Sequence, residues 1–184
     1  MANVWWSSDY HFSHFNIIKY CHRPFTTVEE MNDTIIKNHN MRVKPEDTVF
    51  FLGDFVFRNS PGGKKGEGEI YRAEYFIKQL NGRFVFICGN HDRNNSLKTP
   101  IEKVYIKFGG HRICMVHSPI HADPNKELNL VGHVHEKWVV KRLNEKSILF
   151  NVGVDVHNFK PISYEEINKL LHQFIRHEKK EIKH

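Results

Sequence analysis

The order of the apolar segments predicts an α/β protein with two mixed β-sheets. In the first half of the chain, apolar runs of strand length alternate with stretches of helical periodicity, which gives the order β-α-β-α-β. The second half holds mainly paired strands joined by short turns. In addition, five apolar runs end in Asp, His or Asn. The 184 residues show no internal repeat and no linker, so we expect a single domain over residues 1–184.

The first half is expected to supply three strands and two helices. Runs rich in β-branched and aromatic residues predict strands at residues 4–7, 48–52 and 84–88. We expect the last of these to be central and buried on both faces. Thr27 and Glu30 form a capping box, which begins a helix that reaches about His39. Apolar residues at helical spacing predict the second helix over residues 69–80, with Gly82 as its C-terminal stop.

The second half is expected to supply two hairpins, one further strand and a last helix. The strands are predicted at residues 104–108, 112–116, 128–131, 138–143 and 147–154. Gly109 and Gly110 make the turn of the first hairpin, and residues 144–146 make the turn of the second. Ser163 with Glu166 caps the last helix, whose apolar residues recur at helical spacing.

The composition is typical of a globular cytoplasmic protein with anionic partners. A formal charge of +6 and a pI near 9.2 favour nucleic acid or phosphorylated small molecules. No apolar run approaches the ~20 residues that a membrane span needs, and the N-terminus leads into a strand rather than a signal peptide. Cys21, Cys88 and Cys114 contain no C-x-x-C pair, which predicts buried, reduced thiols.

Polar side chains follow five of the predicted strands. They are Asp9 and His11; Asp54; Asn90, His91 and Asp92; His117; and His133 and His135. Each of these alone has an ordinary explanation, such as a turn cap or a core histidine, but the whole ordered set does not. Because the carboxyl ends of strands in α/β folds meet where ligands bind, we expect one site. Several other histidines are expected at the surface or in loops: His22, His39, His111, His121, His172, His177 and His184.

The set has the composition of a site for two divalent cations. Such a site needs a carboxylate to bridge the ions, with imidazoles and oxygen donors completing each coordination shell. Asp54 is the only candidate ligand that follows its strand, and it suits the bridging position. No cysteine stands at any of these positions, which argues against a structural zinc site. The mixed nitrogen and oxygen donors are compatible with Mn, Fe, Zn, Co or Ni, and we favour Mn.

Taken in order, these motifs resemble the signature of calcineurin-like metallophosphoesterases. The matching segments are Asp9-Tyr10-His11, Gly53-Asp54, Gly89-Asn90-His91-Asp92, His117 and Gly132-His133-Val134-His135. The resemblance covers roughly positions 4 to 155, and residues 8–18 resemble the small, stand-alone bacterial and phage branch of this superfamily. It implies a four-layer α/β/β/α sandwich with the site at the strand ends.

The resemblance also implies a role for each residue. Asp9, His11 and His135 would hold the first metal ion, Asn90, His117 and His133 the second, and Asp54 would bridge both. His91 is not a ligand in this superfamily; it faces the substrate and stabilises or protonates the leaving oxygen. A hydroxide held between the two ions would attack phosphorus in line with the leaving group.

Four further positions bear on the substrate or on the orientation of the catalytic histidine. Arg58 stands where the superfamily's G-D-x-x-x-R pattern has a phosphate-binding arginine. His14 is expected either to contact the substrate or the ligands, or to be an exposed loop histidine. Phe57 replaces the aspartate that orients the catalytic histidine in the protein-phosphatase branch, which argues against a protein phosphatase. Asp92 either takes over that orienting role or holds its loop, and we favour the loop.

A phosphodiesterase acting on a nucleotide or nucleic acid is therefore the favoured function. Arg58 is the one candidate found for a cationic phosphate contact, whereas Phe55 and Phe57 add apolar surface suited to a base or sugar. Residues 59–68, rich in Gly and Lys, predict a mobile loop that draws in a polyanion. The alternatives are a phosphomonoesterase, acting on protein or nucleotide, and a non-catalytic scaffold. The complete ligand set argues against a scaffold, and we expect neither an obligate protein partner nor a membrane.

Overall fold

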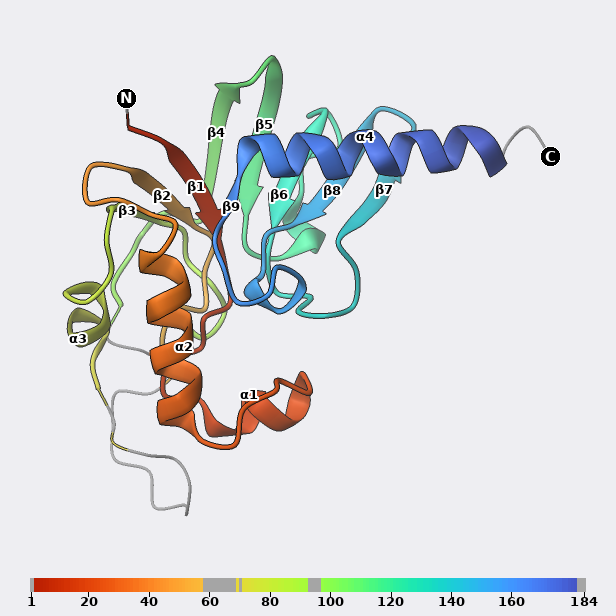
Figure 1. Ribbon diagram of the computed structural model, residues 1–184. Helices are drawn as coiled ribbons and strands as arrows, with labels where there is room; N and C mark the ends of the chain where they lie inside the picture. The colour runs from red at the N-terminus through yellow and green to blue at the C-terminus, as the bar shows by residue number, and fades with distance from the viewer. Residues whose placement is uncertain (1, 58–68, 70, 93–96, 182–184) are drawn as a thin grey trace.

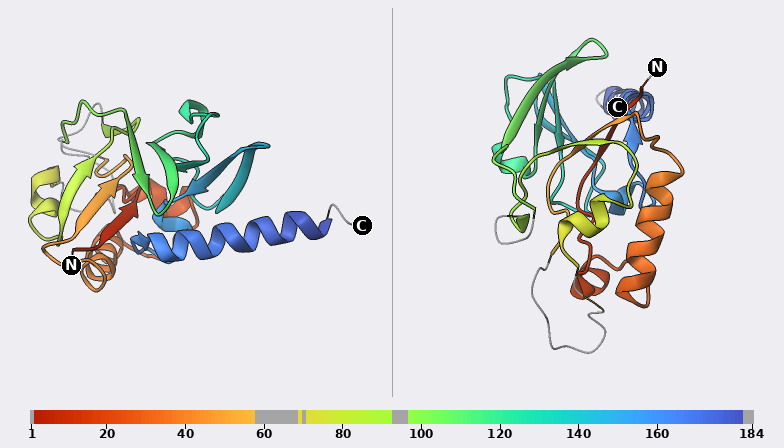
Figure 2. Two further views of the ribbon diagram at one scale, coloured as in Figure 1. Left: turned by 90° about the horizontal axis from the view of Figure 1, so that it is seen from above. Right: turned by 90° about the vertical axis from the view of Figure 1, so that its left-hand side faces the viewer.

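The computed structural model describes residues 2–57, 69, 71–92 and 97–181, and two mixed sheets form its centre (Figure 1). The first sheet has the order β3-β2-β1-β9 and the second the order β4-β5-β6-β8-β7. Helices α1 to α3 lie beside the first sheet, and α4 lies across the strands of the second (Figures 1 and 2). The predicted α/β fold class with two mixed sheets is thus confirmed.

The first sheet brings three strand ends to one edge. Its strands are β1 (Val4–Ser7), β2 (Thr48–Phe51), β3 (Arg83–Phe86) and β9 (Ile162–Ser163). β2 pairs in parallel with both β1 and β3, while β9 is antiparallel to β1. The prediction that β3 is central and buried on both faces is wrong. It is the edge strand of the sheet, with Arg83 exposed and the next three residues half-buried.

The second sheet combines a parallel centre with antiparallel edges. Its strands are β4 (Lys103–Phe108), β5 (His111–Val116), β6 (Leu128–Val131), β7 (Val140–Asn144) and β8 (Ser147–Asn151). β6 pairs in parallel with β5 and β8, whereas β4–β5 and β7–β8 are the two predicted hairpins. The carboxyl ends of β5 and β6 therefore lie side by side, as those of β1 and β2 do.

Two of the helices begin at their predicted caps, and the other two differ from expectation. They are α1 (Phe15–Tyr20), α2 (Val28–Asn40), α3 (Ala73–Ile77) and α4 (Tyr164–Glu181). Thr27 accepts a hydrogen bond of 3.1 Å from the Glu30 N–H, and Ser163 and Glu166 cap α4 reciprocally. α1 was not predicted. The helix predicted over 69–80 is wrong in extent, because α3 begins only after Arg72, which provides no side-chain cap.

Two apolar cores flank the first sheet. One lies against α1 to α3 and includes Met31, Phe51 and Phe76, and the other joins both sheets to α4. His39 was expected at the surface, but it is fully buried on α2. There it accepts a 2.8 Å hydrogen bond from the Tyr10 hydroxyl and donates one of 2.8 Å to the Asn81 carbonyl. These two bonds satisfy both ring nitrogens, which is what allows an imidazole in a core.

Two further observations concern the chain as a whole. Cys21 and Cys114 are buried as predicted, but Cys88 is only half-buried because it lines a cavity. Within the part of the chain that the structure describes, no helix is both long and apolar enough to cross a membrane.

Candidate metal centre

The five motifs meet where the strands of the two sheets end. Asp9 and His11 follow β1, Asp54 follows β2, Asn90 follows β3, His117 follows β5, and His133 and His135 follow β6. Several of these residues have a left-handed backbone, with φ of 60° at Asp9, 51° at His11, 58° at Asp54, 70° at His133 and 49° at His135. Such conformations are costly for residues with a side chain, and they concentrate where a site requires them.

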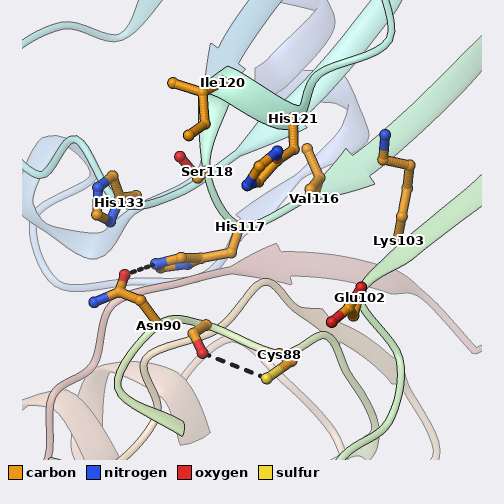
Figure 3. A pocket seen from close by; sticks show the side chains of 11 residues that line it. Cys88, Asn90, Glu102, Lys103, Val116, His117, Ser118, Ile120, His121 and His133 are labelled. Carbon is orange, nitrogen blue, oxygen red and sulfur yellow. Dashed lines mark hydrogen bonds between the residues drawn. The ribbon is translucent and has the colours of Figure 1, made fainter. Parts of the chain in front are cut away.

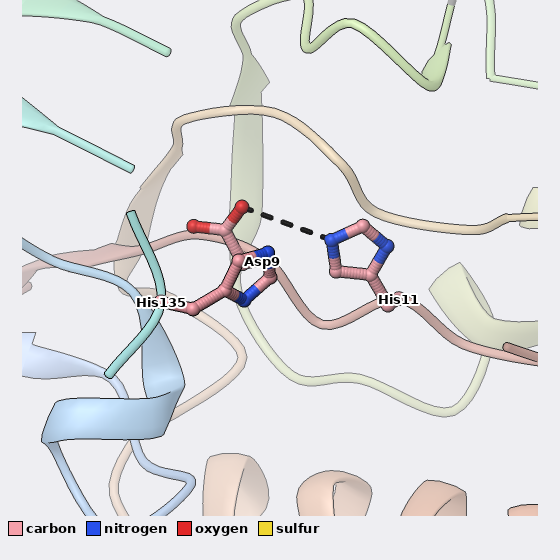
Figure 4. Close-up of side chains that lie close together, drawn as sticks. All are labelled: Asp9, His11 and His135. Atoms are coloured by element: carbon pink, nitrogen blue, oxygen red, sulfur yellow. Dashed lines mark ion pairs between the residues drawn. The ribbon is translucent and has the colours of Figure 1, made fainter. Parts of the chain in front are cut away.

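One group of donors consists of Asp9, His11 and His135 (Figure 4). One ligand atom from each lies within 4.8 Å of the other two. Asp9 and His11 are buried, and the backbone N–H of His133 donates to Asp9 Oδ2 at 2.9 Å. That hydrogen bond fixes the carboxylate of Asp9 while its other oxygen faces His11 Nε2 at 3.9 Å.

A second group consists of Asp54, His117 and His133, again within 4.8 Å. The Nε2 atom of His117 lies 3.3 Å from Asp54 Oδ2 and 2.9 Å from Asn90 Oδ1. Asp54 also faces the first group, because its Oδ2 is 3.5 Å from His11 Nε2. The carboxylate of Asp54 is thus within reach of both groups of donors. This is the arrangement that a bridging ligand requires.

The imidazoles are oriented so that one nitrogen of each points inward. The Nδ1–H of His117 donates to the Leu52 carbonyl at 2.7 Å, and that of His135 donates to Asp155 Oδ2 at 2.9 Å. Outer hydrogen bonds of this kind are the usual way in which a metal-binding histidine is held. His11 Nε2 is buried and has no hydrogen-bond partner among the described residues. A buried nitrogen without a partner is costly in a folded protein, and a cation would supply the missing partner.

The titratable groups of the site also fit a cation. Burial opposes charge on His117, but its hydrogen bond to Asp54 and the nearby Asp9 outweigh burial and raise its pKa to about 9. Burial likewise opposes charge on His135, yet the hydrogen bond to Asp155 raises its pKa to about 10. Burial raises the pKa of Asp9. A cation would displace a proton from such a ligand, since metal ligands must be deprotonated. Donor types, burial and orientation together fit divalent cations.

Close approach of a carboxylate to the backbone explains why two motif positions are glycine, and Asp92 links two of the motif loops. A Cβ on Gly89 would lie 2.2 Å from Asp54 Oδ1, and one on Gly132 would lie 2.6 Å from Asp9 Oδ2. The carboxylate of Asp92 accepts hydrogen bonds from the N–H groups of Asp54 at 2.7 Å and Gly89 at 2.9 Å. Asp92 therefore ties the loops after β2 and β3 together, as favoured from the sequence.

The residues proposed to face the substrate lie beside the first group. His91 Nε2 is 4.0 Å from Asp54 Oδ2, and its side chain is 38% exposed. His14 is buried and stacks on Phe57 with ring centroids 3.6 Å apart and planes 8° apart, so the expectation of an exposed loop histidine is wrong. Its Nδ1 lies 3.4 Å from His11 Nδ1, and burial lowers its pKa to about 3. Arg58 and residues 59–68 lie outside the described residues.

Comparison with known proteins places the chain among small proteins of similar length. It is 38% identical over 178 residues to the uncharacterized protein MJ1445 of Methanocaldococcus jannaschii, covering 93% of this chain and 92% of that protein. The chain belongs to the MJ1445 family. It is also 26% identical over 207 residues to the gene 66 protein of Mycobacterium phage L5, covering 93% of this chain and 95% of that protein.

A solved structure of similar fold extends the comparison. The protein of unknown function AQ665 from Aquifex aeolicus matches with a TM-score of 0.67 and 28% identity, covering 92% of this chain and 100% of that chain. No protein-family model matches the chain. The two mixed sheets, and the meeting of the ordered motifs at the strand ends, agree with the fold that the resemblance to calcineurin-like metallophosphoesterases implies.

Sequence reasoning missed two residues that hold the site of this MJ1445-family protein. Asp155 accepts the His135 hydrogen bond and also binds Arg23, with Nε–Oδ1 at 2.7 Å. Arg23 further donates to the carbonyls of Asp9 at 2.7 Å and Tyr10 at 3.0 Å. Asp155 comes directly after the largely apolar segment 147–154, which contains β8. A polar residue at the end of an apolar run is the signal that identified the candidate ligands. Arg23 gave no comparable signal, because its partners are distant in sequence.

Proposed function

We propose that this protein is a binuclear metal-dependent phosphodiesterase that hydrolyses a nucleotide-type or nucleic-acid phosphodiester. The observation that carries the proposal is that two groups of metal donors, each with two buried members, lie within reach of one carboxylate, Asp54. A single-ion site would not need a second set of oriented imidazoles on the far side of that carboxylate. A non-catalytic scaffold would not need a partly exposed histidine beside the donors either.

The donors divide into two sets around Asp54. Asp9, His11 and His135 would hold one ion, Asn90, His117 and His133 the other, and Asp54 would bind both. Bound divalent cations, with Mn²⁺ our first choice, would activate a water molecule and neutralise the phosphoryl oxygens. The outer partners of His117 and His135 keep their inner nitrogens available for this task.

His91 is proposed to protonate the leaving oxygen. Its backbone N–H donates to Asp54 Oδ1 at 2.9 Å, which fixes the residue relative to the bridging carboxylate. Its partly exposed ring is within reach of a substrate, whereas Asp9, His11 and Asp54 are buried. The distances alone would also allow His91 to join His11 and Asp54 as a ligand. The effect of its removal on metal content therefore tests the role.

The surroundings of His91 favour a diester over a phosphomonoester. A monoester dianion carries more charge at phosphorus and needs additional fixed cations around it. Beside His91 the described residues place an aromatic side chain instead, because the Phe57 ring centroid lies 5.1 Å from that of His91 and Phe57 stacks on His14. Lys137 also lines the cavity beside His91, but it is exposed rather than held in place by burial. Phe55, which was expected to share this role, is fully buried in the core. The net charge of +6 would draw polyanionic substrates toward the site.

A comparison of two substrates tests this function. We expect kcat/KM for bis-p-nitrophenyl phosphate to exceed that for p-nitrophenyl phosphate at one pH and one Mn²⁺ loading. A clear preference for the monoester would replace the diesterase by a phosphomonoesterase with the same metal site. Absence of hydrolysis of either ester by the fully metal-loaded protein would favour a binding scaffold.

A further inference from the structure

Two cavities adjoin the candidate metal centre, one at each set of donors. The larger, of about 650 Å³, is lined by Asn90, His117 and His133 of the second set. The smaller, of about 390 Å³, is lined by His11 and His135 of the first set. Among the described residues the two cavities have no lining residue in common. A phosphoryl group held at Asp54 would therefore have a separate space on each side for a substituent.

The smaller cavity, which we call the His91 cavity, contains the proposed acid. Its lining includes His91, the stacked pair of Phe57 and His14, and Tyr20, whose side chain is 69% exposed. The ester oxygen that takes a proton from His91 must lie against this residue. The alcohol attached to that oxygen therefore belongs in the His91 cavity, where aromatic side chains offer surface to a ring.

The larger cavity, which we call the Ile120 cavity, contains no proposed acid but has a different mixture of groups (Figure 3). Ile120 supplies exposed apolar surface next to the buried Val116, while Lys103 and His121 bring basic groups and Glu102 an acidic one. Ile120 is 83% exposed on the short helix η2 (Pro119–His121), directly after the motif residue His117. A large apolar side chain that is exposed at the mouth of a cavity is typical of a ligand contact.

We propose that the Ile120 cavity binds the ester group that stays on phosphorus, that this group is a nucleoside, and that the leaving alcohol occupies the His91 cavity. The inference rests on the proposed diesterase function. A nucleoside combines an apolar base, suited to Ile120, with a polar sugar whose hydroxyls can pair with the polar lining residues, Glu102, Lys103 and His121 among them. A volume of about 650 Å³ lies within the range of small-molecule sites, ~300–1,000 Å³.

The chemistry that follows is a directional hydrolysis. The oxygen of a water molecule bonds to phosphorus, and the bond from phosphorus to the alcohol oxygen beside His91 breaks. His91 gives a proton to the departing alcohol, and a proton lost by the water passes to solvent. The products are a free alcohol, released from the His91 cavity, and a nucleoside monophosphate, left in the Ile120 cavity. The His91 cavity thus selects the leaving alcohol, and the Ile120 cavity selects the group that stays on phosphorus.

Two diesters with the same leaving group test this assignment. Thymidine 5′-monophosphate p-nitrophenyl ester carries a nucleoside as its retained group, and methyl p-nitrophenyl phosphate carries only a methyl group. We expect the wild-type protein to have the higher kcat/KM for the nucleoside ester. Ile120→Ser should lower the ratio of the two values by about tenfold, the effect expected for loss of apolar contact in a pocket. Phe57→Ala should lower kcat/KM for the two esters by the same factor, since both have p-nitrophenol as the leaving group.

Met41→Ser is the matched control for Ile120→Ser. Met41 is 62% exposed at the end of α2 and lines neither cavity, so its replacement should leave the ratio unchanged. The assignment is overturned if the wild-type protein does not prefer the nucleoside ester, or if Ile120→Ser lowers both values equally.

A binding measurement separates this inference from the proposed function. If neither diester is hydrolysed, the proposed function fails, and calorimetric titration with thymidine 5′-monophosphate then decides on the cavity. Weaker binding to Ile120→Ser than to the wild-type and Met41→Ser proteins supports the Ile120 cavity as a nucleotide site. Equal binding to all three proteins, or no binding to the wild-type protein, overturns it.

Discussion

The buried ion pair of Arg23 and Asp155 allows the support of the first donor set to be tested directly. Its side chains are 0% and 2% exposed, and the Arg23 Nε and Nη2 atoms lie 2.7 and 2.9 Å from the two carboxylate oxygens. The same carboxylate accepts from His135, and the same guanidinium donates to the Asp9 carbonyl. Asp155→Asn should therefore affect both the stability of the fold and the affinity for the first metal ion.

The two effects have different expected sizes. Asp155→Asn leaves the guanidinium of Arg23 buried without a counter-charge, which typically costs about 3–5 kcal/mol of folding free energy. It also deprives His135 of its carboxylate partner, and loss of such an outer partner weakens metal binding by about 10–100-fold. Because the two partners contact each other directly, Arg23→Met combined with Asp155→Asn should cost less than the sum of the two single substitutions.

Urea unfolding in the presence of a chelator measures the first effect, and calorimetric titration with Mn²⁺ measures the second. The control is the exposed pair of Arg72 and Glu74, 3.6 Å apart with side chains 73% and 58% exposed. Glu74→Gln should cost no more than about 1 kcal/mol, as is usual for surface pairs. The reasoning is refuted if Asp155→Asn is as stable as Glu74→Gln, or if its affinity for Mn²⁺ equals that of the wild-type protein.

Two further predictions concern histidines. His91→Ala should retain both metal ions yet lose about 10²–10⁴-fold in turnover, the usual contribution of a positioned acid; the exposed His22→Ala is the control, and loss of metal from His91→Ala would make His91 a ligand instead. Burial lowers the pKa of His39 to about 4, so between pH 6.5 and 4 the unfolded chain binds a proton that the folded protein excludes. Urea unfolding of the metal-free proteins measures how much more stable the wild-type protein is than His39→Leu. This difference in unfolding free energy should shrink by up to about 3 kcal/mol as the pH falls through that window. A difference that does not change with pH would contradict the prediction.

The convergence of the candidate donors could be predicted from the sequence because strand ends in an α/β fold converge whatever the details of packing. Asp54 and His117 needed only an apolar run before them to be placed at the same edge. The position of β3 could not be predicted in this way, because the aromatic run of an edge strand looks like that of a central one. Phe84 and Phe86 stack on each other and contact Phe55, so their face packs into the core, whereas the opposite face carries the exposed Arg83 beside Val85.

Other differences arise from contacts between distant residues. Arg23 and Asp155 are 132 positions apart, and no local pattern reports such a pair. His39 is a different case, because it continues the buried stripe of Val28, Met31 and Ile35 on α2, and its helical position outweighs its polar character. α3 shows the converse, since the helical spacing predicted over residues 69–80 produced a helix only over Ala73–Ile77, which has no side-chain N-cap.

Metal content tests the central claim most directly. Elemental analysis of the purified protein after incubation with Mn²⁺ should show two tightly bound ions per chain in the wild-type protein and in the exposed-carboxylate control Asp33→Ala. Asp54→Ala should lose both ions together, because its carboxylate lies within reach of both donor sets, 3.5 Å from His11 Nε2 and 3.3 Å from His117 Nε2. Two tightly held ions in Asp54→Ala would contradict a shared, bridged centre.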